Sequence, residues 1–141
     1  MPANTKVIDQ LFTYGTLQDK EIQQLLFGCT CVMRKAMLPG WSLYASLQDG
    51  YLFIKPDDLT SRVSGSLLAI NAEALQAADL WEEVPLLYQR EAVLVRLEDG
   101  SELEAWAYTR REKAGVPYAG KQLSLLEQQA VLAAAQQSIS A

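Results

Sequence analysis

The chain of 141 residues contains no histidine. This absence excludes the Ser-His and Cys-His nucleophile pairs of many hydrolases, together with histidine-based metal centres. The two cysteines, Cys29 and Cys31, are too few for a zinc site, and we expect both to be reduced thiols. If the protein is an enzyme, its acid–base group must therefore be Glu, Asp, Lys, Tyr or Cys.

Basic residues and long apolar runs are also scarce. Lys and Arg number 12 against 17 Asp and Glu, which gives a formal net charge of −5. Nucleic-acid phosphates need a basic face, so we expect no nucleic-acid partner. No stretch approaches the roughly 20 apolar residues of a membrane span, and the N-terminus lacks the apolar run of a signal peptide. We therefore expect a cytoplasmic protein without membrane association.

Half of the residues, 50%, are hydrophobic, which is enough for a core at this length. No repeat or low-complexity linker divides the chain, so we expect residues 1–141 to form one domain. Apolar alternation and turn signals predict strands over residues 7–14, 30–38, 41–46, 51–55, 62–70, 88–97 and 102–110. Helical spacing and capping residues predict helices over residues 19–27, 72–82 and 123–138.

These elements favour an α+β fold with a closed or strongly curled sheet. Most strands follow one another with short connections, so a meander is the expected order. Asp99-Gly100 between two long strands predicts a β-hairpin. Asp19 and Asn71 are the expected N-cap residues of the first two helices.

The first candidate for a functional site is the loop Tyr14-Gly15-Thr16-Leu17. Glycine permits a sharp turn and a close approach of the backbone to a ligand, and the N–H groups that follow can bind a carboxylate or an oxyanion. Thr16 adds a hydroxyl donor, and Tyr14 adds a wall. The alternative is an ordinary strand end with a turn glycine.

The second candidate is the pair Glu82 and Glu83, at the end of the predicted helix. Trp81 and the apolar residues around it indicate partial burial, which raises the pKa of a carboxyl group toward the range of a general acid–base. The alternative is a solvated helix end, although acidic residues at a C-terminus oppose the helix dipole. If the helix register is off by one residue, Glu83 replaces Glu82.

Together, the two segments resemble the γ-glutamylcyclotransferase-like superfamily. The loop Tyr14-Gly15-Thr16-Leu17 is similar to its signature loop, and Trp81-Glu82-x-x-Pro85-x-x-Tyr88-x-Arg90 is similar to its catalytic-glutamate segment. The intervening stretches 38–43, 63–68 and 105–108 agree in order. The closest resemblance is to γ-glutamylamine cyclotransferases and their plant and bacterial relatives.

The resemblance implies a small mixed β-barrel with flanking helices. It also implies an enzyme that releases 5-oxoproline and a free amine or amino acid from a small γ-glutamyl substrate, with no cofactor and no metal. The residues at 14–17 would bind the α-amino-acid end of the substrate, and Glu82 would be the acid–base. Tyr88 and Tyr108 are weaker candidates for the pocket wall. Arg90 is either a substrate contact or a structural ion-pair partner.

The chain departs from the family pattern at two places. Glu83 stands where the family often has Gly, and Tyr51-Leu52 stands where it often has Tyr-Pro. These departures leave the identity of the substrate open, and the sequence does not give the oligomeric state. Two other functions remain: a module of the same fold that binds a γ-glutamyl or amino-acid-like ligand without turnover, and an interaction protein that docks a partner through its sheet or through helix 123–138.

Overall fold

The computed structural model describes residues 8–111 and 115–118 of the chain. In these residues the chain forms eight strands, two α-helices and one short 3₁₀ helix. In chain order they are β1 (Gln10–Thr13), η1 (Thr16–Gln18), α1 (Lys20–Phe27), β2 (Met33–Pro39), β3 (Trp41–Ser46), β4 (Leu52–Pro56), β5 (Arg62–Ala69), α2 (Ala72–Trp81), β6 (Gln89–Leu97), β7 (Glu102–Thr109) and β8 (Gly115–Pro117).

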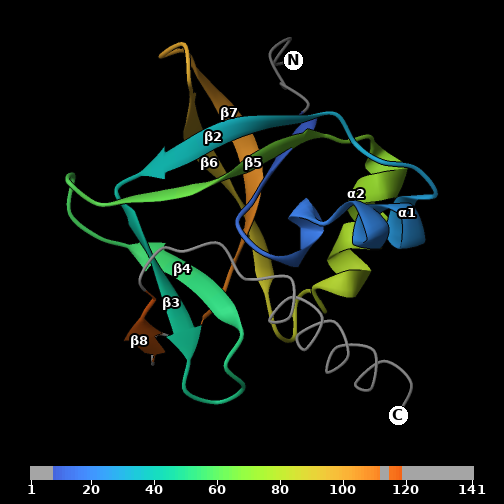
Figure 1. The fold of residues 1–141 in the computed structure, drawn as a ribbon. Coiled ribbons are helices and arrows are strands. Elements are labelled where there is room, and N and C mark those ends of the chain that lie inside the picture. The colour runs from blue at the N-terminus through green and yellow to red at the C-terminus, as the bar shows by residue number, and fades with distance from the viewer. Residues whose placement is uncertain (1–7, 112–114, 119–141) are drawn as a thin grey trace, which may run out of the picture.

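Five strands close into a barrel in the order β1-β5-β2-β6-β7 (Figure 1). All neighbours are antiparallel except β1 and β7, which pair in parallel through Leu11 and Trp106. Closure pairs every barrel strand on both sides, so no long edge is left exposed in this sheet. The expected α+β fold with a small, mixed, closed barrel and flanking helices is confirmed.

The expected meander is wrong for most of the barrel. Only β6 and β7 are neighbours both in the barrel and in sequence, and their pairing confirms the hairpin predicted at Asp99-Gly100. In contrast, β1 pairs with β5, and β2 lies between β5 and β6. The reason is that apolar alternation is a local pattern, whereas the choice of a neighbour depends on contacts between distant segments.

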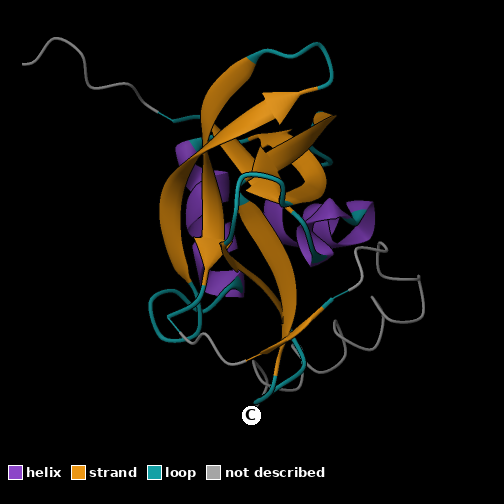
Figure 2. Cartoon of the chain, turned by 90° about the vertical axis from the view of Figure 1, so that its left-hand side faces the viewer, coloured by secondary structure: helices purple, strands orange, loops and turns teal. Residues whose placement is uncertain are grey.

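The remaining strands form a second sheet in the order β4-β3-β8. The sequence did not predict β8, whose three residues are too short to show alternation. Figures 1 and 2 show this sheet on one side of the barrel, while α1 and α2 lie against each other on another side. The barrel therefore has a helical flank and a sheet flank.

Both predicted helix N-caps are confirmed. The Asp19 side chain accepts hydrogen bonds from the backbone N–H groups of Glu21 and Ile22, and the Asn71 side chain accepts one from Ala74. These bonds satisfy N–H groups that have no partner within the helix. The 3₁₀ turn η1 was not predicted, since its three residues carry no periodic pattern.

The apolar residues divide into two clusters because successive side chains of a strand point to opposite faces. One cluster fills the barrel and includes Phe12 and Leu67. The other includes the next residues on those strands, Leu11 and Leu68, and packs under the helices together with Ala78 of α2. Strands β1 and β5 are therefore buried on both faces, one facing the barrel interior and the other facing the helices.

The remaining predictions concern the cysteines, the last helix and membrane association. Strand β2 begins at Met33, three residues later than the predicted start at residue 30, so Cys29 and Cys31 both precede it, and both are free thiols. Helix 123–138 lies outside the described residues. In the part of the chain that is described, no helix has the length and apolar character needed to cross a bilayer.

Candidate active site

The topology brings the ends of several elements together at one end of the barrel. Strands β1 and β7 are parallel, so their carboxyl ends lie at the same end. Strand β6 is antiparallel to β7, so its first residue, Gln89, pairs with Thr109 at that end. As a result Tyr14 after β1, Tyr88 before β6 and Tyr108 in β7 converge, although they are far apart in sequence.

Glu82 is the C-cap residue of α2, and its backbone N–H donates to the carbonyl of Ala78. Within the described residues, its carboxyl group forms no hydrogen bond and no ion pair. Burial raises the pKa of this carboxyl to about 8, and the negative charge of Glu83 adds to the shift. A carboxyl group with this pKa can both accept and donate a proton near neutral pH.

Three tyrosines interact electrostatically with the Glu82 carboxyl. Burial is the main reason that the pKa of Tyr14, Tyr88 and Tyr108 is raised, and the charge of Glu82 contributes to each shift. Tyr14 donates its hydroxyl hydrogen to the backbone carbonyl of Tyr108 at 2.8 Å, and Tyr88 donates to the carbonyl of Leu52 at 2.7 Å. The predicted site residues Tyr14, Glu82, Tyr88 and Tyr108 therefore form one group.

The third tyrosine is held by an acidic side chain of α2. The Tyr108 hydroxyl donates to Asp79 Oδ1 at 2.7 Å. Asp79 also receives two hydrogen bonds from Arg90, at 2.9 and 3.2 Å, and the Arg90 guanidinium lies 4.3 Å from the centre of the Trp106 ring. The structural alternative for Arg90, an ion-pair partner, matches these contacts.

The tyrosine hydroxyls all direct their hydrogens at protein acceptors. A hydroxyl that has donated its hydrogen keeps lone pairs that accept hydrogen bonds. The oxygens of Tyr14, Tyr88 and Tyr108 can therefore accept from an ammonium group, which carries only donors. Such a group next to Glu82 would also favour the ionised form of its carboxyl.

The loop residues 15–17, which lie beside the group around Glu82, differ from one another in their contacts. Among the described residues, a Cβ atom built on Gly15 would meet no atom within 4 Å. Gly15 is the N-cap residue of η1, and no side chain from that same part of the chain caps the N–H groups there. The Thr16 hydroxyl accepts a hydrogen bond from the indole of Trp81 at 3.3 Å, while the Leu17 side chain is buried in the core.

The geometry favours Glu82 over Glu83 at the centre of the site. Glu83 is exposed and has a φ of 54°, in the left-handed region that favours glycine. This conformation gives a physical reason for the glycine that often stands here in the family that the sequence resembles. The pKa of Tyr51 is raised by burial first and then by the negative charges of Asp49 and Glu83.

An ion pair that no sequence motif indicated lies beside Tyr88. The buried Arg110 guanidinium forms two hydrogen bonds of 3.0 Å with the carboxylate of Asp49 and lies 5.2 Å from the centre of the Tyr88 ring. Arg110 follows Tyr108 by two residues, so strand periodicity alone places both on one face. Similarly, Asp79 precedes Glu82 by three residues, a spacing that puts two side chains on one helix face.

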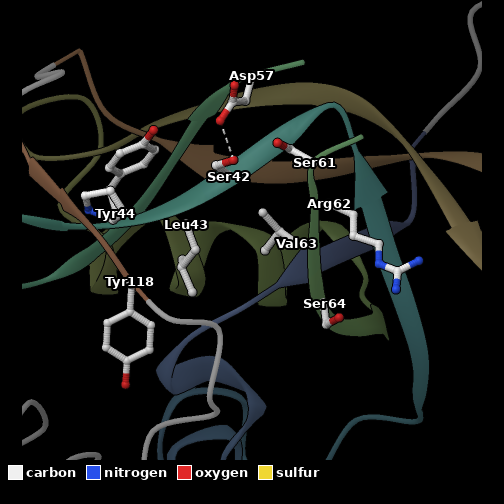
Figure 3. A pocket seen from close by; sticks show the side chains of 10 residues that line it. Ser42, Leu43, Tyr44, Asp57, Ser61, Arg62, Val63, Ser64 and Tyr118 are labelled. Atoms are coloured by element: carbon white, nitrogen blue, oxygen red, sulfur yellow. Dashed lines mark hydrogen bonds between the residues drawn. The ribbon is translucent and has the colours of Figure 1, made fainter. Parts of the chain in front are cut away.

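A separate cleft of about 370 Å³ lies along β3 and β5. Its lining includes Leu43, Val63 and Tyr44, and the Ser42 hydroxyl donates to Asp57 at 2.6 Å above it (Figure 3). None of the predicted site residues lines this cleft. It is therefore distinct from the group around Glu82. Over the described ranges, no three His, Cys, Asp or Glu side chains are grouped as metal ligands.

Fold and site together define a class: in the described residues, a closed mixed barrel is flanked by two α-helices and carries at one end a buried carboxyl group that interacts electrostatically with three tyrosines. A comparison with protein families matches residues 11–128 to the family described as gamma-glutamyl cyclotransferase, AIG2-like. The match spans most of the chain, and the protein belongs to this family. No curated protein sequence matches the chain.

Solved structures share the fold at low sequence identity. A protein from Arabidopsis thaliana, solved in solution, is 20% identical with a TM-score of 0.66, covering 99% of this chain and 92% of its own. An AIG2-like protein from Mus musculus is 19% identical with a TM-score of 0.67, covering 82% and 88%. A gamma-glutamyl cyclotransferase is 19% identical with a TM-score of 0.65, covering 73% and 66%.

Proposed function

We propose that this protein is a cyclotransferase that releases 5-oxoproline and a free amine or amino acid from a γ-glutamyl compound. The observation that carries the proposal is the environment of Glu82. Its carboxyl group is buried, interacts electrostatically with Tyr14, Tyr88 and Tyr108, and has a pKa raised to about 8. A solvated acid at a helix end would keep a pKa close to the usual glutamate value. Membership of the family supports the reaction type.

The reaction is an intramolecular acyl transfer. The α-amine nitrogen of the substrate attacks its own γ-carbonyl carbon, a ring C–N bond forms, and the C–N bond to the leaving amine breaks. Ionised Glu82 takes a proton from the α-ammonium, which frees the amine for attack, and the nitrogen loses a second proton as it becomes the ring amide. Both protons end on the leaving nitrogen, which departs as an ammonium, so the carboxylate of Glu82 is regenerated. Because nucleophile and carbonyl belong to one molecule, orientation and proton transfer supply most of the catalysis.

The other residues bind and orient the substrate. The oxygens of Tyr14, Tyr88 and Tyr108 accept hydrogen bonds from the α-ammonium. The backbone N–H groups that follow Gly15, together with the Thr16 hydroxyl, bind the α-carboxylate. Leu17 contributes its backbone to this turn, since its side chain is 1% exposed and belongs to the core. No cofactor takes part in the proposed reaction.

The test is an assay of 5-oxoproline release from γ-glutamyl-amines, γ-glutamyl dipeptides and glutathione. We expect Glu82→Gln, which keeps the shape of the side chain, to lower kcat by about 100-fold or more, the usual contribution of general acid–base catalysis. Glu83→Gln is the matched control and should remain active. Loss of activity in Glu83→Gln alone would move the acid–base role to that residue.

A wild-type protein without activity on any of these compounds would contradict the enzyme. In that case titration calorimetry with 5-oxoproline and the same γ-glutamyl compounds would distinguish the remaining functions. Binding that is lost in Glu82→Gln would identify the non-catalytic binding module. Absence of binding would reject both readings of the site.

A further inference from the structure

The last residue of α2, Trp81, makes a hydrogen bond that the proposed reaction does not use. Its indole Nε1 donates to Thr16 Oγ1 at 3.3 Å, and both side chains are partly buried. The bond joins α2 to the first residue of η1, 65 positions away in the chain. Trp81 also immediately precedes Glu82, so one helix end contacts the Thr16 hydroxyl and carries the proposed acid–base.

The direction of this bond restricts the Thr16 hydroxyl. An indole N–H is only a donor, whereas a hydroxyl has one hydrogen and two lone pairs. Once Thr16 Oγ1 accepts from Trp81, its own hydrogen must point away from the indole. Over the described residues, that hydrogen has no protein acceptor. It lies beside Gly15, where a Cβ atom would meet no atom of the described residues within 4 Å.

We infer that Trp81 is a positioning residue, which turns the Thr16 hydroxyl into a hydrogen-bond donor aimed at an anionic oxygen of the ligand. This inference rests on the proposed function, because the ligand is the carboxylate end of a γ-glutamyl compound. Without the indole N–H, the hydroxyl is free to rotate, and part of its interaction with the carboxylate is lost. Trp81 itself does not touch the substrate.

A double-mutant cycle tests whether Trp81 acts through Thr16. Trp81→Phe keeps an aromatic ring in the core and removes the N–H, while Thr16→Val keeps the shape and removes the hydroxyl. We expect KM to rise about fivefold in Trp81→Phe and about tenfold in Thr16→Val, with kcat nearly unchanged, as for loss of a binding hydrogen bond. The double variant should be about tenfold impaired, not about fiftyfold.

Trp41→Phe is the matched control, because it makes the same chemical change in β3, away from Glu82, and should leave KM at the wild-type value. Thermal unfolding of each variant separates loss of fold from loss of binding. Multiplicative losses in the double variant would overturn the inference, and so would a Trp81→Phe protein with wild-type KM and an intact fold.

The proposed function is tested independently of the role of Trp81. Turnover by wild type that disappears in Glu82→Gln supports the reaction, whatever the cycle shows. If wild type binds 5-oxoproline without turnover, the same cycle is measured on Kd and tests the inference alone. A wild-type protein that neither binds nor converts these compounds overturns both.

Discussion

Burial of the Glu82 carboxyl, which suits the proposed reaction, lowers the stability of the fold. Burial favours its neutral form, so between the usual glutamate pKa of about 4.3 and a folded pKa of about 8 the native state holds a proton that the unfolded chain has released. The free energy of unfolding therefore falls as the pH rises through this window and levels off above it. We expect Glu82→Gln to have a higher Tm than wild type, by a difference that grows across the window.

Calorimetric or circular-dichroism melts between these limits check this prediction. Glu104→Gln, which changes an exposed carboxylate of β7, is the control and should show a difference that does not grow with pH. A constant difference between Glu82→Gln and wild type would mean that the Glu82 carboxyl ionises in the native state as it does in the unfolded chain.

Glu83 combines a charge effect with a backbone effect, and two variants separate them. Glu83→Gln removes the charge that raises the pKa of Glu82 but keeps a side chain at φ 54°. Glu83→Gly removes both and should raise the free energy of unfolding by about 0.5–1 kcal/mol, because glycine adopts this conformation without strain.

Both Glu83 variants should shift the rising limb of kcat/KM to lower pH than in wild type. The reason is that kcat/KM reports the pKa of the free enzyme, and removal of the neighbouring charge lowers the pKa of Glu82. A pH–rate profile with full kinetics at each pH provides the measurement. Identical pH–rate profiles in wild type and both Glu83 variants would show that ionisation of Glu82 does not determine the rising limb of kcat/KM.

Among single residues, the sequence predicted those that belong to an unusual motif, but it did not predict the side chains that hold them in place. The spacing from Trp81 to Tyr88 predicted the group around Glu82 through a family resemblance. Asp79 was not predicted because an acidic residue on a helix usually faces solvent. In the structure its carboxylate instead accepts a hydrogen bond from the Tyr108 hydroxyl. The strain at Glu83 is equally invisible, since φ depends on the surrounding chain.

Among the elements, β5 depends on a glycine where it crosses β1. A Cβ atom on Gly65 would collide with the backbone carbonyl of Thr13 and lie 2.9 Å from the Phe12 ring. Both neighbours are buried and close-packed, so neither can move aside easily. We expect Gly65→Ala to lower the free energy of unfolding by about 2 kcal/mol or more, as overpacked cores do.

Urea unfolding of Gly65→Ala measures this loss, and Ser64→Ala, an exposed change on the same strand, should stay within about 0.5 kcal/mol of wild type. The displaced Thr13 leads directly into Tyr14, so the Gly65 variant should also bind substrate less tightly. Equal stability of the two variants would contradict the close approach of β1 and β5.

The elements themselves were largely predictable, because capping residues, turns and alternation act over a few positions. Asp19, Asn71 and the turn at Asp99-Gly100 each produced the expected local structure. The order of the barrel strands was not predictable in this way. Nothing near Gln10 in the sequence indicates that β1 pairs with β5 and β7, since both partners are chosen by burial of apolar faces contributed by distant segments.

For the whole molecule, the ion pair of Asp49 and Arg110 connects the small sheet to the barrel. Asp49 lies in the turn between β3 and β4, and Arg110 directly follows β7. Burial opposes ionisation of Asp49, but hydrogen bonds from Arg110 and the Tyr51 backbone lower its pKa below the usual range. This pair therefore stabilises the fold above the usual aspartate pKa of about 3.9, and the contribution is lost as the pH falls through the lower folded pKa.

We expect Asp49→Asn to lower the free energy of unfolding at neutral pH by about 2 kcal/mol, since it leaves the buried Arg110 guanidinium without its counter-charge. The difference from wild type should shrink in strong acid, where Asp49 itself is neutral. Denaturant titrations at both pH values measure it. Glu102→Gln, in the exposed pair with Arg96, should cost less than about 0.5 kcal/mol.

The parallel contact between β1 and β7 has a consequence for the order in which the protein gains its site. This contact joins the first barrel strand to the last, through Leu11 and Trp106, so a growing chain cannot make it until nearly all of the barrel has been synthesised. Tyr14 and Tyr108 meet only across that seam. No fragment that ends before β7, and no intermediate with an open barrel, can bring these two groups together. Binding of a ligand at the proposed site would therefore require complete closure, and such a ligand would stabilise the barrel as a whole against unfolding.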